Sequence, residues 1–348
     1  MRVCKAALLA LAIAVAGCGS DAATKDQPAA TEPPRTVTDL ADRTVELPAK
    51  IDRVATVGLV PPNNSIVFAL GAGGKIVNGP PGGYGETYAS YKYLAPHLVD
   101  APPIEAAIND PVNREALLEL APDVVVASDA EMAETLEDTG IPTVVITPSD
   151  PEGIKRSVTL LGEVFGEPDR AAAYVKYFDD AVARLEQIGK EVPDPGKPTL
   201  LYLSLSEPMR RPALTIDWAA EILGATPVTA HNKKPGWYEF GVEQVQKWDP
   251  DVIIALYPSD KQELERDRRF ATLRAVRDKR IYVSPTGAQL WGQTTSENPL
   301  GILWLAKTLR PEQTADLDMA AETKSFYDRF FGVQLTDDQV AAMLAPGS

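Results

Sequence analysis

The sequence predicts an α/β protein made of two Rossmann-like lobes, with parallel-rich sheets flanked by helices and one long interlobe helix. Short apolar segments alternate with helical patterns along the chain, which is typical of parallel sheets covered on both faces. One helix–Pro-Asp–strand pattern also occurs twice, as NREALLELAPDVVVA (113–127) and GVEQVQKWDPDVIIA (241–255). A repeated α/β unit indicates one copy in each of two similar lobes.

Length and charge narrow the classes of function. The chain has 348 residues, of which 45% are hydrophobic, so each of two lobes can bury a sizeable core. Its formal net charge is −15, and an acidic surface repels the phosphates of nucleic acids. We therefore expect no nucleic-acid partner.

Residues 1–17 predict an export signal, because Arg2 and Lys5 precede an apolar run that is too short for a comfortable membrane span. The run ends in Val15-Ala16-Gly17-Cys18, which resembles the lipobox of bacterial lipoproteins. This resemblance implies that Cys18 carries fatty-acid chains such as palmitate and holds the protein on the extracytoplasmic face of the cell membrane by its lipid alone. An ordinary signal peptide with a chance cysteine is the alternative. Residues 18–36, rich in Ala, Pro, Thr and Asp, predict a flexible tether.

Residues 37–167 predict the N-terminal lobe, called the N-lobe below. Strands are expected at RTVEL, RVATVG, KIVNG, DVVVAS and TVVIT, which are short and rich in β-branched residues. Helices are expected at 64–70, 114–120, 131–139 and 151–166, the last with Asp150 as its N-cap and Pro151 in its first turn.

A single helix is predicted over residues 168–190, because its apolar side chains fall on one stripe at helical spacing. It would join the N-lobe to the C-terminal lobe, the C-lobe, at residues 191–345. There the pattern predicts strands at LLYLSLS, DVIIALY and RIYVSP, and helices at 218–224, 242–248, 261–277, 298–309 and 314–331.

Three features carry a family resemblance: the two Glu…Pro-Asp repeats, the segment TVTDLADRTVELPAKIDRVATVG and the segment WGQTTSENPLGILWLAKTLRPE. Together they resemble the substrate-binding proteins of iron–siderophore and vitamin B12 ABC importers. The resemblance covers residues 37–335. It implies two lobes bridged by one rigid helix, a monomer that closes little on its ligand, and delivery to an ABC permease dimer with its ATPase subunits. It also implies that the protein captures a metal chelate, with a ferric siderophore first among the ligands. Cobalamin, haem, molybdate, a nickel complex, or a sensor role in place of import are the alternatives.

The resemblance gives the repeated glutamates a role as well. Glu115 and Glu243 match the exposed glutamates with which the family docks onto arginines of the two permease subunits. A Glu in the first turn of a helix is also favoured by the helix dipole, so a purely local explanation stays open.

Ligand contacts are expected on loops that mix aromatic and basic residues, because a rigid frame usually carries its binding residues on loops. Such loops suit a planar, anionic and partly apolar ligand. The predicted ligand-binding residues are Tyr84, Tyr88, Tyr91, Arg210, Arg211, Trp237, Tyr238 and Trp291.

No protein-bound metal, cofactor or catalytic residue is expected. The only histidines, His97 and His231, lie in different lobes, and both cysteines precede the predicted lobes. The sequence has no G-x-S-x-G, H-E-x-x-H or G-x-x-x-x-G-K-[ST] motif. GAGGK at 71–75 follows a predicted helix and indicates a C-cap turn instead of a phosphate loop. We therefore expect a binding protein and no enzyme.

Overall fold

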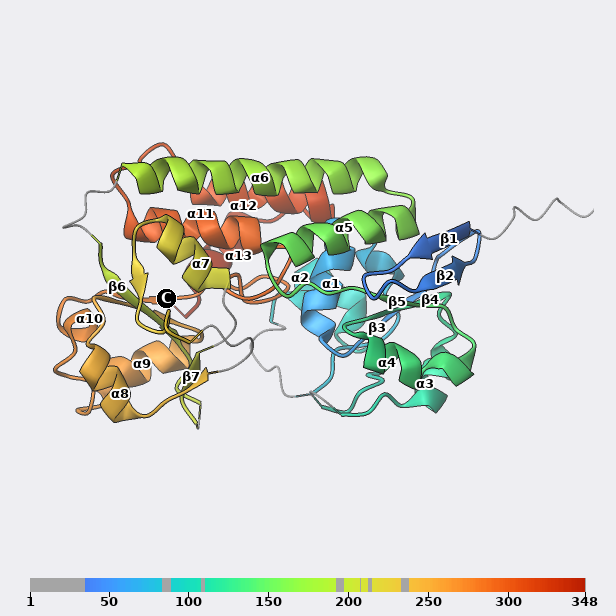
Figure 1. Ribbon diagram of the computed structural model, residues 1–348, viewed down its shortest axis with the longest axis horizontal. Coiled ribbons are helices and arrows are strands. Elements are labelled where there is room, and N and C mark those ends of the chain that lie inside the picture. The colour runs from blue at the N-terminus through green and yellow to red at the C-terminus, as the bar shows by residue number, and fades with distance from the viewer. Residues whose placement is uncertain are drawn as a thin grey trace, which may run out of the picture. The chain divides into compact units, whose positions relative to one another are not determined.

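Two parallel sheets organise the fold of the computed structural model (Figure 1). The structure describes residues 35–82, 89–107, 110–191, 197–206, 208–211, 215–232 and 238–347. The N-lobe sheet has the strand order β3 (Val54–Val57), β4 (Val124–Ala127), β5 (Thr143–Val145), and the C-lobe sheet has the order β11 (Ile281–Val283), β10 (Val252–Ala255), β6 (Thr199–Leu203), β8 (Thr226–Pro227). All neighbours within these two sheets pair in parallel, so the predicted fold class is confirmed.

Helices and one antiparallel strand pair complete each lobe. The N-lobe adds the pair β1 (Arg35–Thr38) and β2 (Thr44–Leu47), with helices α1 (Val60–Ala69), α2 (Tyr91–Leu94), α3 (Arg114–Leu120), α4 (Ala130–Thr135) and α5 (Pro151–Phe165). The C-lobe adds the pair β7 (Arg210–Arg211) and β9 (Tyr238–Glu239), with helices α7 (Thr215–Ile222), α8 (Val242–Trp248), α9 (Pro258–Arg266), α10 (Arg274–Arg277), α11 (Asn298–Leu309), α12 (Met319–Phe326) and α13 (Asp337–Leu344).

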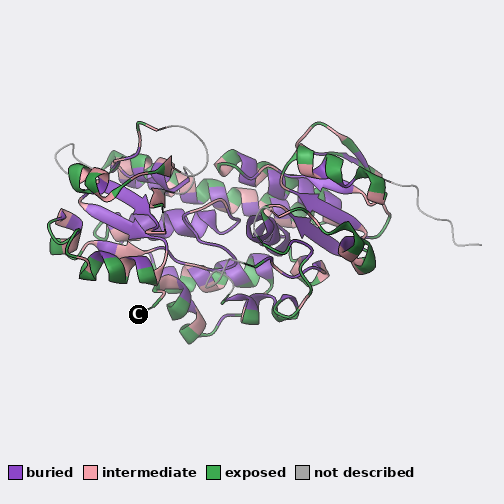
Figure 2. Cartoon of the chain, turned by 90° about the horizontal axis from the view of Figure 1, so that it is seen from below, coloured by how far each residue is buried: buried purple, intermediate pink, exposed green. Residues whose placement is uncertain are grey.

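Every central strand is buried on both faces, as Figure 2 shows. Successive side chains of a strand point to opposite faces of its sheet. In β4, Val124 and Val126 join one apolar cluster while Val125 and Ala127 join another. The C-lobe strands β6 and β10 divide in the same way. One of the three clusters contains residues of both lobes, so the lobes share a continuous core.

Helix α6 (Pro168–Lys190) runs along both lobes at the upper edge of Figure 1. It packs against α5 from the N-lobe and α11 from the C-lobe. Its buried side chains are Ala171, Tyr174, Phe178, Ala181, Leu185 and Ile188, which form one stripe. Residues Pro34–Ser348 form a single compact unit.

Three sequence predictions differ from the structure in detail. Helix α1 begins at Val60, four residues before the predicted start, because Pro61 and Pro62 fit its first turn, where a missing N–H costs nothing. Residues 75–79 form no strand and pair with β3 only through a Val54–Ile76 bridge. The predicted helix over 261–277 is two helices, α9 and α10, with turns at residues 267–273 between them.

Candidate functional site

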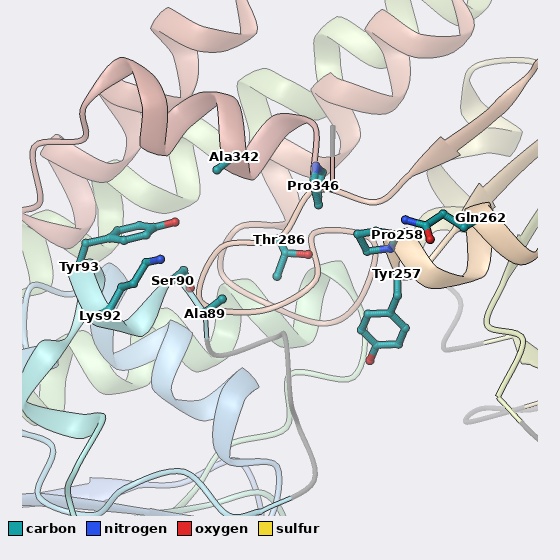
Figure 3. A pocket seen from close by; sticks show the side chains of 11 residues that line it. Ala89, Ser90, Lys92, Tyr93, Tyr257, Pro258, Gln262, Thr286, Ala342 and Pro346 are labelled. Atoms are coloured by element: carbon teal, nitrogen blue, oxygen red, sulfur yellow. The ribbon is translucent and has the colours of Figure 1, made fainter.

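A cavity of about 470 Å³ lies where the two lobes meet, and we call it the interlobe cavity (Figure 3). Its walls come from three parts of the chain. The N-lobe contributes Ala89, Ser90, Lys92 and Tyr93; the C-lobe contributes Tyr257, Pro258, Gln262 and Thr286; the C-terminal helix and the residues after it contribute Ala342, Pro346 and Gly347. Tyr257 and Thr286 follow β10 and β11, so the cavity lies at the carboxyl edge of the C-lobe sheet, where open α/β sheets bind ligands.

The polar lining of the interlobe cavity includes one cation and one protonated tyrosine hydroxyl. Lys92 is exposed, and its ammonium has no carboxylate partner among the residues that the structure describes. Burial and the nearby carboxylate of Glu297 raise the pKa of Tyr93 to about 12, so its hydroxyl stays protonated at neutral pH. Ser90 and Thr286 add hydroxyl oxygens, but their hydrogens are donated to the backbone oxygens of Gly287 and Ser284. The cation and the Tyr93 hydroxyl suit a ligand that is anionic or rich in acceptor atoms.

Hydrogen bonds hold the two sides of the cavity together. The Ser90 hydroxyl donates to the backbone oxygen of Gly287 across the lobe boundary. Ser296, before α11, donates two hydrogen bonds to Ser65 on α1, from its N–H to the hydroxyl oxygen at 3.0 Å and from its hydroxyl to the backbone oxygen at 2.6 Å. The Tyr174 hydroxyl on α6 donates to the backbone oxygen of Ser296 at 2.7 Å. Hydrogen bonds thus join α1, α6 and the segment before α11.

The buried carboxylate of Glu297 fixes the loop that carries Thr286. It accepts the backbone N–H groups of Ala288 and Gln289 at 2.8 and 3.0 Å and a hydroxyl bond from Thr295. The Tyr327 hydroxyl donates to it as well. Burial raises the pKa of Glu297 while these donors oppose the shift. Its four donors and full burial indicate a structural role.

Two of the predicted ligand-binding residues lie in the core. Tyr91 is 1% exposed; its hydroxyl accepts a 3.2 Å bond from the Asn64 amide, and its ring packs edge-on against Phe68. Trp291 is 0% exposed, beneath α11. A ligand could not touch either side chain in this structure, because each is enclosed by apolar neighbours, so we leave both out of the proposed site.

The C-lobe strand pair β7–β9 brings together other predicted ligand-binding residues. Arg211 pairs with Tyr238 in the antiparallel register, and Arg210 pairs with Glu239. The Arg210 Nε donates to the Ser206 hydroxyl at 3.1 Å, while the Tyr238 ring packs against His231 at 5.9 Å between ring centroids.

Several predicted residues cannot be placed. Tyr84, Tyr88, Trp237 and Cys18 lie outside the described residues, as does the side chain of Arg211.

The duplicated unit repeats in atomic detail. Helices α3 and α8 have seven residues each and end in a residue with a left-handed backbone, Ala121 (φ 43°) and Asp249 (φ 40°). In the N-lobe, Asp123 accepts the backbone N–H of Arg53 at 2.9 Å. In the C-lobe, Asp251 accepts the N–H of Thr199 at 2.8 Å. Each Pro-Asp thus ties its strand to the start of the lobe's first parallel strand.

Glu115 and Glu243 occupy the same position in the two copies. Each is exposed and is the second residue of its helix. Figure 1 places α3 and α8 at the lower edge of the molecule, one in each lobe, on the side away from α6. The two glutamates therefore belong to helices on the same side of the molecule.

Sequence reasoning did not single out Tyr257 or Gln262 as ligand contacts, whereas Lys92 lies in one of the loops of mixed aromatic and basic residues on which contacts were expected. The position of Tyr257 directly after the apolar run VIIAL was an available signal, because ligands gather at the carboxyl ends of parallel strands. Gln262 offered no comparable signal, since it lies one helical turn further along α9.

Comparison with known proteins identifies the family. A family model described as "Periplasmic binding protein" matches residues 63–287. The chain belongs to this family. Its members are solute-binding proteins, so the chain is a substrate-binding protein of the ABC-importer type, and the predicted family resemblance is confirmed.

Two curated relatives span nearly the whole chain. The molybdate-binding protein MolA of Haemophilus influenzae is 28% identical over 337 residues, covering 88% of this chain and 93% of MolA. The uncharacterized ABC transporter substrate-binding lipoprotein YvrC of Bacillus subtilis is 25% identical over 321 residues, covering 88% of this chain and 96% of YvrC.

Solved structures agree. A periplasmic solute binding protein from Veillonella parvula superposes with a TM-score of 0.77 at 29% identity, covering 89% of this chain and 96% of the Veillonella chain. Molybdate-bound MolA superposes with a TM-score of 0.74 at 26% identity, covering 87% of this chain and 99% of the MolA chain.

The described residues contain neither a cluster of metal ligands nor a membrane-spanning helix. Among the described residues, no group of three or more His, Cys, Asp or Glu side chains could hold a metal ion. In the same part of the chain, no helix has the length and apolar character needed to cross a bilayer.

Proposed function

We propose that this protein captures an anionic metal complex in the interlobe cavity and delivers it to an ABC permease, with a ferric siderophore as the first ligand to test. The observation that carries the proposal is the Lys92 ammonium in the lining of the cavity, which has no carboxylate partner among the described residues. A cationic lining in a chain of net charge −15 would concentrate an anion in the cleft.

The size of the cavity favours a chelate over a bare ion. Cavities that enclose ligands of drug-like size span about 300–1,000 Å³. At about 470 Å³ the interlobe cavity falls within that range. The apolar faces of Tyr93 and Tyr257 could pack against the organic part of a chelate, while Lys92 pairs with its negative charge.

Molybdate is the second candidate, and one observation favours it. MolA, which is similar to this chain over nearly its whole length, is a molybdate-binding protein. A tetrahedral oxyanion is an acceptor on every side, so it suits the same donors. Cobalamin, haem and nickel complexes are weaker candidates, since neither cavity nor relative favours one of them.

The remaining parts of the proposal concern partners and location. Cys18 would anchor the mature chain through its lipid, which the name of the lipoprotein YvrC supports by analogy. Glu115 and Glu243 would dock one on each permease subunit, which their matching positions on helices at the same side of the molecule support. A sensor that hands its ligand to a membrane receptor would use the same cavity, and a cognate permease and ATPase would distinguish the importer from it.

Titration of intrinsic tryptophan fluorescence tests the ligand. The mature chain without its lipid is titrated with ferric catecholates, ferric hydroxamates, haem, cobalamin, molybdate and a nickel chelate. Saturable binding of an anionic metal complex at sub-micromolar concentration is expected. Lys92→Ala should weaken that binding by about tenfold or more, because a charge-assisted hydrogen bond is lost. Lys190→Ala, an exposed lysine at the end of α6, is the matched control and should bind as the wild type does. Binding of only cationic or neutral ligands would contradict the proposal.

A further inference from the structure

The duplicated unit extends beyond its strand into a second helix. Helix α4 begins fifteen residues after Glu115, and α9 begins fifteen residues after Glu243. Residues 113–140 therefore correspond one to one with residues 241–268, and we call them the N-lobe copy and the C-lobe copy. In Figure 1, α3 and α4 lie in the lower part of the N-lobe, and α8 and α9 lie in the lower part of the C-lobe.

The two copies differ in charge. The N-lobe copy has eight acidic residues and one basic residue, whereas the C-lobe copy has seven acidic residues and four basic ones. The basic residue of the N-lobe copy, Arg114, pairs with Asp138 at 2.6 Å. Five other acidic residues of this copy are exposed and form no ion pair with any described residue: Glu115, Glu119, Glu131, Glu134 and Glu137. The N-lobe copy therefore presents a surface of unpaired negative charge.

In the C-lobe copy, ion pairs within the chain hold most of the acidic residues. Arg274 binds two aspartates, Arg269 binds an aspartate and a glutamate, and Lys261 binds a glutamate. The paired carboxylates are those of Asp249, Asp251, Asp267, Glu263 and Glu265. Glu243 is exposed and has no ion pair among the described residues. The two docking glutamates thus have different electrostatic surroundings.

An exposed leucine adds a second difference between the copies. Leu118 is 51% exposed and lies one helical turn after Glu115, so the two side chains are neighbours on the surface of α3. The corresponding residue of the C-lobe copy is Gln246, whose side-chain amide donates to the backbone oxygen of Arg269 at 2.7 Å. The N-lobe copy therefore presents an apolar group beside its docking carboxylate, where the C-lobe copy presents a tethered amide.

These features suit a basic partner with an apolar depression. Unpaired carboxylates attract a cationic surface and repel an anionic one. A second copy of this chain, with a formal net charge of −15, would be repelled, and so would a membrane of anionic lipid. The exposed part of Leu118 gains free energy when a partner removes it from water. A protein surface with Arg or Lys side chains around an apolar depression meets both requirements.

Resting on the proposed function, we propose that the N-lobe copy is the dominant docking point for the permease, and that Leu118 fills an apolar depression between basic residues of one permease subunit. Docking is then asymmetric, although the two lobes repeat the same unit. The charge of the N-lobe copy speeds association, and burial of Leu118 slows dissociation. Glu243 orients the C-lobe with a single exposed charge.

Binding to the permease–ATPase complex that imports the saturating ligand tests the role of Leu118. The complex is held in nanodiscs of phosphatidylcholine, whose headgroups have no net charge, and the mature chain without its lipid is the analyte. Leu118→Gln should raise the dissociation constant about threefold to tenfold, mainly through faster dissociation, because half of a leucine side chain is no longer buried. Val99→Gln replaces another exposed apolar residue of the N-lobe, outside the N-lobe copy; it is the matched control and should bind as the wild type does.

Charge variants test the asymmetry. Glu119→Gln with Glu134→Gln removes two unpaired charges from the N-lobe copy and should slow association about threefold or more at low salt. Glu263→Gln with Glu265→Gln changes the net charge equally in the C-lobe copy, where both carboxylates are already paired, and should slow association less. An equal effect of the two double variants would contradict a dominant N-lobe docking point.

The outcomes separate this inference from the proposed function. If the wild type does not bind the permease complex, the proposed importer function fails, and the docking inference fails with it. If the wild type binds and Leu118→Gln binds equally well, the docking inference alone is wrong. Self-association or binding to anionic vesicles that Leu118→Gln abolishes would assign this surface to another partner and overturn the inference as well. Because Leu118 is exposed, the variant should keep the ligand affinity and the free energy of unfolding of the wild type.

Discussion

At the scale of single residues, the position of a charge matters more than the total charge. The chain is strongly acidic, yet the interlobe cavity contains an exposed lysine, while the buried carboxyls of Glu105 and Glu297 are held by neutral donors outside its lining. Lys92 would attract an anion to the cavity. Composition alone could not have predicted this effect, because it depends on which side chains the fold leaves without a charged partner.

Glu105 should also make the stability of the fold depend on pH. Its folded-state pKa of about 7 lies above the ordinary value of 4.5, so the folded protein holds this proton more tightly than the unfolded chain does. The free energy of unfolding should therefore fall as pH rises from about 4.5 through 7, by about 2–3 kcal/mol from this group. Denaturant unfolding of the wild type and Glu105→Gln at the two ends of that range measures the difference, which should vanish in the variant. An equal pH dependence in both proteins would contradict the assignment.

Prediction from sequence succeeded least for individual site residues. Tyr91 and Trp291 were predicted to touch ligand because aromatic residues in irregular segments resemble binding loops, yet both fill the core. Burial depends on contacts between distant segments, such as Tyr91 with Asn64, and the local pattern does not contain them. Lys92 offered the opposite case, since only the tertiary fold reveals that it lines a cavity.

At the scale of elements, the sequence predicted the helices and strands better than it predicted individual site residues. The duplicated helix–Pro-Asp–strand unit was visible because each step has a local cause: Pro ends the helix, Asp accepts backbone N–H groups, and a β-branched run forms the buried strand. Asp150 as the N-cap of α5 follows the same logic, and its side chain accepts the Gly153 N–H. The start of α1 was missed although Pro61 and Pro62 are a local signal for a first helical turn, and the break between α9 and α10 was missed as well.

The left-handed residue that closes each repeated helix gives a prediction at this scale. Ala121 has φ 43°, which costs a residue with a Cβ about 1 kcal/mol, and glycine avoids that cost. Ala121→Gly should therefore raise the free energy of unfolding by about 0.5–1 kcal/mol, after the entropy cost of glycine is subtracted. Ala116→Gly, inside α3, is the matched control and should lower it by a similar amount. Urea denaturation checks both, and destabilisation by Ala121→Gly would show that the strain is absent.

At the scale of the whole molecule, α6 and the Ser65–Ser296 bonds make the two lobes one body. A core cluster contains residues of both lobes, and the Tyr174 hydroxyl ties α6 to the segment before α11. This arrangement suits a protein that closes little on its ligand. The parallel sheets and the joining helix could be predicted from periodicity, whereas the hydrogen bonds between lobes could not, since serines at 65 and 296 carry no local signal.

Tyr174→Phe tests how much the hydrogen bond between α6 and Ser296 stabilises the fold. The variant keeps the buried ring and removes only the hydroxyl bond to the Ser296 oxygen, leaving a buried acceptor unpaired. We expect a loss of about 1–2 kcal/mol in the free energy of unfolding. Denaturant unfolding should still show one transition for both lobes. Tyr177→Phe, which removes a second hydroxyl bond of α6, to Glu322 on α12 at 2.7 Å, shows how much of the loss belongs to any tyrosine hydroxyl on this helix.

The pair Glu115 and Glu243 gives the prediction that needs the whole molecule, because only both lobes together present one anion to each permease subunit. The double variant Glu115→Lys, Glu243→Lys should bind ligand as the wild type does, since both side chains are exposed on helices away from α6. Uptake by cells that contain the cognate permease should fall by about tenfold or more, because like charges at both docking points slow association.

The control is Glu186→Lys, Glu312→Lys, which changes the net charge equally but alters α6 and the turn after α11. Unchanged uptake in the first pair, or ligand affinity lost together with uptake, would rule out docking through these glutamates. An equal loss of uptake in the control pair would assign the effect to net charge instead of position.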